Sequence, residues 1–163
     1  MYAAITQMAK MLRNLDNWMT KAEAHAKTKN FDWNNFATLR LTPDMYTFTR
    51  QVQIATDHAK GGPARLAGLE PPKFEDNEAS FADLKARLAR VQDFLATLKP
   101  AQIDGSEERK IVLKFGPREF EFVGLPYLTQ FVLPNFYFHY TTAYAILRHN
   151  GVDVGKRDFL GAF

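Results

Sequence analysis

The sequence predicts an all-α protein, a four-helix bundle with a short β-hairpin between the third and the fourth helix. In three segments the apolar residues recur at spacings of three and four, which is the pattern of an amphipathic helix. A fourth segment is apolar on nearly all sides, as a buried helix is. Between the third and fourth segments the period changes to two, which indicates strands. We therefore expect one domain that covers residues 1–163.

The first helix is expected near the N-terminus, where one apolar stripe runs from residue 5 to residue 26. Its lysines and arginines lie off that stripe and indicate a solvated face. After Lys29, asparagine and aspartate are mixed with aromatic residues as far as Phe36, so we expect a packed loop with one short helical turn. The stripe consists of Ile5, Met8, Leu12, Leu15, Met19, Ala22 and Ala26.

The second helix is predicted to begin at Thr42-Pro43-Asp44. Threonine can cap free N–H groups, proline suits the first helical position, and aspartate complements the positive end of the helix dipole. Gly61-Gly62-Pro63 opposes an undisturbed helix, because an interior proline costs roughly 3 kcal/mol or more. We expect a kink or a break there. The apolar stripe consists of Met45, Phe48, Val52, Ala55, Ala59 and Leu66.

The third helix is predicted from about Asn77, with its apolar stripe between Phe81 and Leu98. Lys85, Arg87, Arg90 and Asp93 occupy other directions of that helix. Two runs with a period of two follow, separated by Gly116-Pro117, and they predict a β-hairpin whose apolar face lies on the helices. The apolar positions of the hairpin are Ile111, Leu113, Phe115, Phe120 and Phe122.

The last helix is expected from about Leu125 to Asn150, with a kink at Pro134 and an end at Asn150-Gly151. Because this helix is apolar nearly all round, its extra apolar surface indicates a dimer. The tail after it carries Phe159, Leu160 and Phe163, so we expect it to pack against the bundle.

Composition excludes several functional classes. The net charge is only +3 and is spread over all segments, so we expect no nucleic-acid partner. The longest apolar runs are too short to cross a membrane, and no secretory pattern is present, so we expect a cytoplasmic protein without a membrane partner. The absence of cysteine excludes disulfides, zinc–thiolate sites, iron–sulfur clusters and cysteine nucleophiles.

No phosphate loop, dinucleotide fingerprint, nucleophile elbow or HExxH motif is present. The best candidate is a polar stripe on the last helix, where Asn135 and His139 stand four residues apart and face one point, as paired metal ligands on helices do. Alternatively, His139 is a hydrogen-bonded core residue and Asn135 satisfies backbone groups released at Pro134. On the second helix Gln51 and His58 share one side. Either could complete a site with His139, or His58 is a surface residue.

Several strings of the sequence resemble an uncharacterised bacterial family, a domain of unknown function within the DinB/YfiT-like four-helix superfamily. The resemblance covers essentially the whole chain, and it implies a bundle that forms dimers. Superfamily members are regarded as metalloenzymes, with one histidine from the second helix and an H-x-x-x-H pair from the fourth. Some act as metal-dependent thiol transferases or hydrolases. The most specific strings are residues 133–139 and 147–151, with others at residues 21–26, 41–45, 50–55, 64–68 and 105–109.

Carried over to this chain, the H-x-x-x-H pair falls on Asn135 and His139, and the second-helix ligand falls near Gln51 or His58. Amide side chains bind zinc, nickel or copper less well than imidazoles do, so the sequence favours a small-molecule-binding bundle with a degenerate metal site. Tyr137, Tyr140 and Gln51 would then supply hydrogen bonds in an aromatic pocket. The alternative is a divalent-metal-dependent thiol transferase or hydrolase centred on His139, with Asn135 and His58 or Gln51. A third interpretation makes Asn135 and His139 a purely structural polar network.

Overall fold

The computed structural model describes residues 1–162, with the side chain of Phe115 excepted. Phe163 and the Phe115 side chain, both named above, lie outside the described part. None of the described helices is long and apolar enough to cross a membrane. The elements in chain order are α1 (Tyr2–Lys29), the 3-10 helix η1 (Trp33–Thr38), α2 (Phe48–Leu66), α3 (Phe81–Thr97), α4 (Pro100–Ile103), β1 (Lys110–Phe115), β2 (Arg118–Val123), α5 (Gly124–Pro126), the π-helical segment η2 (Tyr127–Val132), α6 (Leu133–His149) and α7 (Lys156–Leu160).

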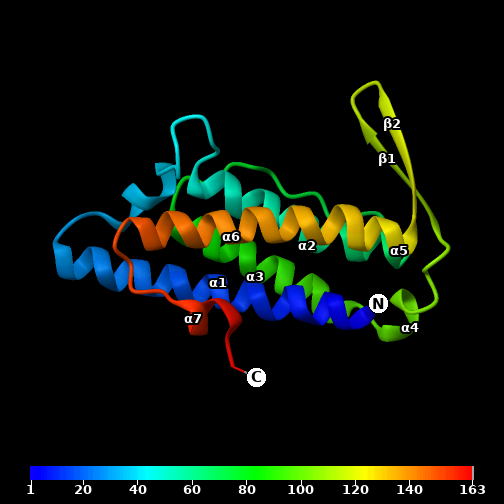
Figure 1. The fold of residues 1–163 in the computed structure, drawn as a ribbon, viewed down its shortest axis with the longest axis horizontal. Helices are drawn as coiled ribbons and strands as arrows, with labels where there is room; N and C mark the ends of the chain where they lie inside the picture. Colours follow the sequence, from blue (N-terminus) through cyan, green and yellow to red (C-terminus); the bar gives the residue numbers. More distant parts are fainter. Residues whose placement is uncertain (163) are drawn as a thin grey trace.

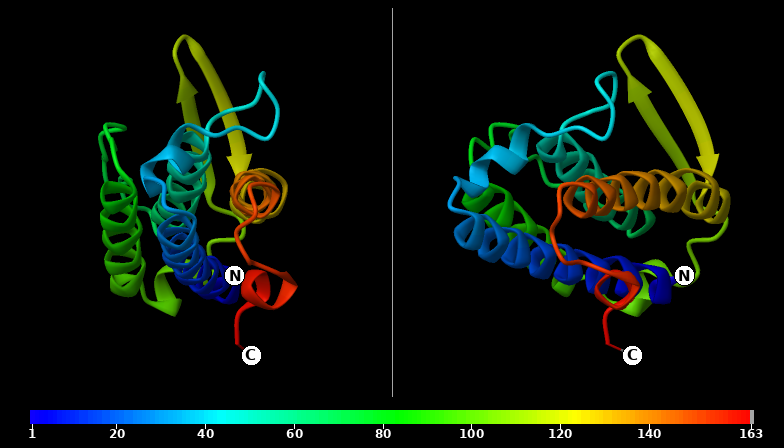
Figure 2. Two further views of the ribbon diagram at one scale, coloured as in Figure 1. Left: turned by 90° about the vertical axis from the view of Figure 1, so that its left-hand side faces the viewer. Right: turned by 60° about the vertical axis from the view of Figure 1, so that its left-hand side comes forward.

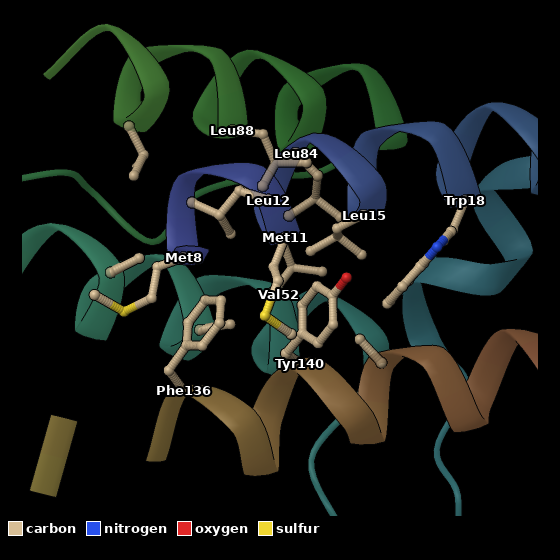
Figure 3. Packing of buried hydrophobic residues seen from close by; sticks show 14 of the residues in the cluster. Met8, Met11, Leu12, Leu15, Trp18, Val52, Leu84, Leu88, Phe136 and Tyr140 are labelled. Carbon is tan, nitrogen blue, oxygen red and sulfur yellow. The ribbon is translucent and has the colours of Figure 1, made fainter. Parts of the chain in front are cut away.

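Four long helices, α1, α2, α3 and α6, form the predicted bundle (Figures 1 and 2). Helices α2 and α3 run in the same direction, because residues 67–80 return along the bundle before α3 begins (Figure 1). Side chains from all four helices meet in one apolar core, in which Trp18, Val52 and Leu84 are 0 % exposed (Figure 3). The apolar stripes of the sequence are therefore the faces that the bundle buries.

Helix α2 begins later than the sequence predicts. Thr42-Pro43-Asp44 forms a turn, in which the Thr42 hydroxyl donates to the Asp44 carboxylate over 2.7 Å. The helix is capped by Thr47, whose hydroxyl oxygen accepts from the Arg50 backbone N–H. Both threonines suit a cap locally, so the packing of the following residues decides between them.

Of the two outcomes expected at Gly61-Gly62-Pro63, a kink or a break, the break is absent, since α2 continues to Leu66. A Cβ atom on Gly62 would lie 2.5 Å from Cγ1 of Val132, so glycine here lets α2 and η2 approach closely. Pro63 lies in the last turns of the helix. The close packing of η2 offsets the low helix propensity of these residues.

Arg87 is the centre of a buried network of charged side chains. It lies outside the apolar stripe of α3, yet its side chain is 0 % exposed. Its guanidinium donates to Asp57 on α2 over 2.7 Å and to Glu78 in the returning segment over 3.0 Å, and its Nε donates to the Thr56 hydroxyl over 2.7 Å. Asp76 lies 3.0 Å away as a further ion-pair partner. This network fastens the returning segment between α2 and α3.

The hairpin is confirmed, with β1 and β2 antiparallel in a register that pairs Ile111 with Phe122 and Leu113 with Phe120. Ile111 and Leu113 are buried, and Phe122 packs on Tyr127 with ring centroids 5.6 Å apart. The far part of the ribbon projects from the bundle (Figures 1 and 2), and Phe120 is 43 % exposed. The apolar face therefore lies on the helices only near the base of the hairpin.

The last predicted helix is one helical run from Gly124 to His149 with the π-helical segment η2 inside it. Pro134 directly follows η2, so the missing N–H of this proline falls where the helical run changes from π-helical to α-helical hydrogen bonding. The run ends at Asn150 and Gly151 as predicted, and the φ of Gly151 is +87°. The tail then packs down, with Phe159 against Trp18 at a ring-centroid distance of 5.7 Å.

We expect Arg87→Met to lower the free energy of unfolding by about 3–5 kcal/mol, because the buried carboxylate of Glu78 loses its principal cation. Arg90→Met is the matched control, since Arg90 is half exposed and lies 3.8 Å from Glu78. Urea denaturation of both variants measures the difference. Equal losses in the two variants would contradict the role given to Arg87.

Candidate functional site

Helices α2 and α6 bring three of the predicted site residues together. Gln51 and His58 are seven residues apart on α2 and so lie on one side of it, and His139 lies on the facing side of α6. The Gln51 Oε1 and His139 Nδ1 atoms are 2.7 Å apart. The His58 ring lies nearly parallel to the His139 ring, with an interplanar angle of 8° and a centroid distance of 6.5 Å. Gln51 is thus the hydrogen-bond partner of His139, and His58 is its ring neighbour.

The hydrogen bonds of Gln51 fix the tautomer of His139. The Gln51 amide nitrogen donates to the Tyr46 backbone oxygen over 3.2 Å, so the Gln51 oxygen is the atom that faces His139. An oxygen only accepts, so the His139 Nδ1 carries the proton and Nε2 keeps its lone pair. The His139 Nε2 atom has no hydrogen-bond partner within residues 1–162. Every buried side-chain nitrogen and oxygen in those residues does have one, so Nε2 is reachable by solvent.

Both histidines are held in the neutral form. Burial lowers the pKa of His58 to about 4, and the neighbouring His139 and the positive charges of Arg65 and Lys60 act in the same direction, against Asp57. Burial also lowers the pKa of His139, with a contribution from Arg50. The sequence left open whether His58 is a surface residue. It is half-buried, with its ring edge-to-face against Phe131.

Asn135 serves the backbone at the junction of η2 and α6. Its amide nitrogen donates to the Phe131 backbone oxygen over 2.7 Å. This is the arrangement that the structural alternative described for a residue next to Pro134. The side chain also lines the cavity described below, together with His58.

The two tyrosines predicted to bind a ligand lie elsewhere. Tyr140 is fully buried on the core side of α6 (Figure 3), where its hydroxyl donates to the Phe159 backbone oxygen and burial raises its pKa. Its ring packs on Trp18 at a centroid distance of 4.6 Å. Tyr137 is 38 % exposed and packs edge-on against Phe136. Neither residue lines the cavity.

A cavity of about 1130 Å³ lies beside His58, between α2, the start of the returning segment, β1 and η2. The sequence did not predict it, because its walls come from segments far apart in the chain and only His58 on α2 and Asn135 on α6 were candidate residues among them. Apolar and basic side chains share the lining. The principal lining residues are Arg50, Ile54, Asp57, His58, Lys60, Arg65, Leu69, Glu70, Arg109, Lys110, Ile111, Lys114, Tyr127, Phe131 and Asn135.

These residues fit a resident transition metal poorly. No cluster of three or more histidine and carboxylate side chains that could hold a metal exists within residues 1–162. The candidate donors are two neutral imidazoles and the amide of Asn135. The carboxylate of Asp57, next to His58, is already in ion pairs with two cations. The cations that lower the pKa values of His58 and His139 would also repel a divalent ion.

Comparison with known proteins identifies the family. Residues 1–160 match the family described as a domain of unknown function, DUF1993. The chain belongs to this family. The DUF1993 chain is also similar to a solved structure, that of a DinB family member protein from Shewanella denitrificans, with 42% identity and a TM-score of 0.91. The match covers 98% of this chain and 90% of that chain, and it confirms the DinB-like fold. No curated protein matches the DUF1993 chain.

The half-buried, neutral His58 predicts a pH-dependent stability of the DUF1993 chain. A histidine in the unfolded chain has a pKa near 6.5, against about 4 in the fold, so the unfolded state binds more protons between these values and stability falls as the pH is lowered through that window. We expect His58→Gln to remove on the order of 2 kcal/mol of the loss between pH 7 and pH 4.5.

Chemical denaturation at a series of pH values measures this dependence. His149→Gln, at the exposed end of α6, is the matched control for the loss of one histidine. A His58→Gln variant with the same slope as the His149→Gln variant would show that His58 does not titrate as inferred.

Proposed function

We propose that the protein is a small-molecule-binding helical bundle in which the metal site of the DinB superfamily is degenerate. The observation that carries this proposal is the cavity of about 1130 Å³ that His58 helps to line, a volume slightly above the usual range of small-molecule sites. Beside it, Gln51 holds His139 in one tautomer with a solvent-reachable Nε2. The site therefore offers a ligand an apolar wall and fixed hydrogen-bonding groups.

His58 can both donate a hydrogen bond to a ligand and accept one from it. Its ring nitrogens have no hydrogen-bond partner within residues 1–162, and because the ring is neutral it has one N–H donor and one acceptor. The parallel stack on His139 and the edge contact with Phe131 limit the orientation of the ring. A small molecule in the cavity would thus meet a positioned imidazole.

The alternative is a divalent-metal-dependent thiol transferase or hydrolase centred on His139, with zinc, nickel or manganese as the metal. The observation in its favour is the pair of neutral imidazoles from facing helices, with ring centroids 6.5 Å apart. Against it stand the amide of Asn135 at the third position and the surplus of nearby cations. The Asn135 amide and the nearby cations favour the small-molecule-binding bundle over the metal-dependent enzyme.

Metal content separates these two functions. We expect well below one equivalent of zinc, nickel or manganese per chain in protein purified without a histidine tag or chelator and then incubated with each metal. Inductively coupled plasma mass spectrometry measures it, with His139→Ala as the comparison. Near one equivalent in the unaltered protein, lost in His139→Ala, would favour the metal-dependent enzyme. Background metal in both, with saturable thermal stabilisation by a small molecule, would support the proposal.

We further propose that the protein is a homodimer in a bacterial cytoplasm. Support for the dimer comes from α6, where Phe138 is 56 % exposed and the adjacent Tyr137 is 38 % exposed. Sedimentation equilibrium measures the mass, and Phe138→Lys is expected to shift a dimer toward the monomer. A monomeric unaltered protein at micromolar concentration would contradict this proposal. The cytoplasmic location remains a prediction from the sequence.

A further inference from the structure

The cavity carries an excess of positive charge. Six basic side chains line it against two acidic ones, Asp57 and Glu70. Four of the six are already paired with a carboxylate, so their charge is largely offset. These pairs are Arg50 with Asp76, Lys60 with Asp57, Lys110 with Glu121, and Lys114 with Glu119.

Arg65 and Arg109 are different, because neither has an ion-pair partner within the described residues. Arg65 is half-buried, and its Nη1 donates to the Gly61 backbone oxygen over 3.1 Å and to the Tyr127 hydroxyl over 3.3 Å. The Nε and Nη2 atoms of Arg65 make no hydrogen bond to residues 1–162. Because every buried side-chain nitrogen and oxygen in residues 1–162 has a hydrogen-bond partner, these two atoms are not buried and are open to solvent. The Arg65 guanidinium is thus held in place through Nη1, while its Nε and Nη2 atoms are free to bind a ligand.

Arg109 lies against the same end of α2. Its Nη1 occupies the space that a side chain at residue 68 would take, since a Cβ atom on Gly68 would lie 2.1 Å from it. The φ of Gly68 is +75°, which favours glycine, and the Gly68 N–H donates to the Arg65 backbone oxygen over 3.0 Å. Both unpaired arginines therefore line the cavity at the C-terminal part of α2 and the turn that follows it.

The remaining wall is apolar. Phe131 and Tyr127 stack with ring centroids 5.8 Å apart, and Ile111 of β1 and Ile54 of α2 also line the cavity. His58 lies beside Phe131. A ligand that suits both parts has an anionic group for the arginines and an apolar body for the rings.

We propose that this cavity binds a small organic oxyanion, with its carboxylate or phosphate group held by Arg65 and Arg109 and its apolar body against Phe131 and Ile111. This inference rests on the proposed function and narrows it to a class of ligand. A guanidinium with free N–H groups matches the geometry of either oxyanion.

Three probes of similar shape test it by isothermal titration calorimetry: 1-naphthyl phosphate, 1-naphthoate and the neutral 1-naphthol. We expect saturable binding of at least one anion and much weaker binding of 1-naphthol. The stronger of the two anions identifies the head group. Arg65→Gln and Arg109→Gln should each weaken anion binding roughly 10- to 100-fold, because each removes a charged hydrogen bond.

Arg13→Gln is the matched control, since Arg13 is exposed on α1, has no carboxylate partner within residues 1–162 and undergoes the same change of charge. It should bind like the unaltered protein. Arg109 is exposed, so its variant is expected to fold. Equal binding of 1-naphthol and the anions, unaffected by both cavity variants, would overturn the inference and leave small-molecule binding in place. No saturable binding of any probe would overturn the inference and count against the proposed function as well.

Discussion

The rotation of α2 within the bundle depends on the buried guanidinium of Arg87. An arginine is tolerated in the interior only where its charge and donors are satisfied, and here Asp57, Thr56 and Glu78 satisfy them. Because Asp57 and Thr56 belong to α2, this pairing turns one side of α2 toward α3. The opposite side, with Gln51 and His58, then has to face α6. The charged network and the candidate site are thus two sides of one helix.

The side chains around Gln51, His58 and His139 determine the protonation state of the two histidines. Gln51 is tied to the Tyr46 backbone, so its oxygen can only accept from His139, and both histidines stay neutral because burial and nearby cations disfavour the protonated ring. A surplus of cations disfavours a metal dication as well as a proton. The site therefore combines two neutral histidines with a surplus of positive charge, and the proposed anion binding rests on this combination.

The fold could be predicted from the sequence where a single element contains the whole signal. The stripes of α1 and α3 and the period of two in the hairpin are such signals. The start of α2 could not, because Thr42 and Thr47 are equivalent locally and packing selects Thr47. Arg87 was missed since its carboxylate partners lie on other segments. The spacing of Gln51 and His58 placed both on one face, but Arg65 and Arg109 line one cavity only because the tertiary fold brings residue 109 against the turn at Gly68.

One wall of the cavity comes from the hairpin, which pairs only with itself and projects from the bundle (Figure 1). The ribbon rests on the helices through a few side chains near its base, Ile111 and Phe122 among them. Its outer residues can therefore change during evolution with little effect on the packing of the four helices. Relatives could diverge in ligand preference through this ribbon while the bundle stays constant, in the way that antibody loops vary on a conserved scaffold.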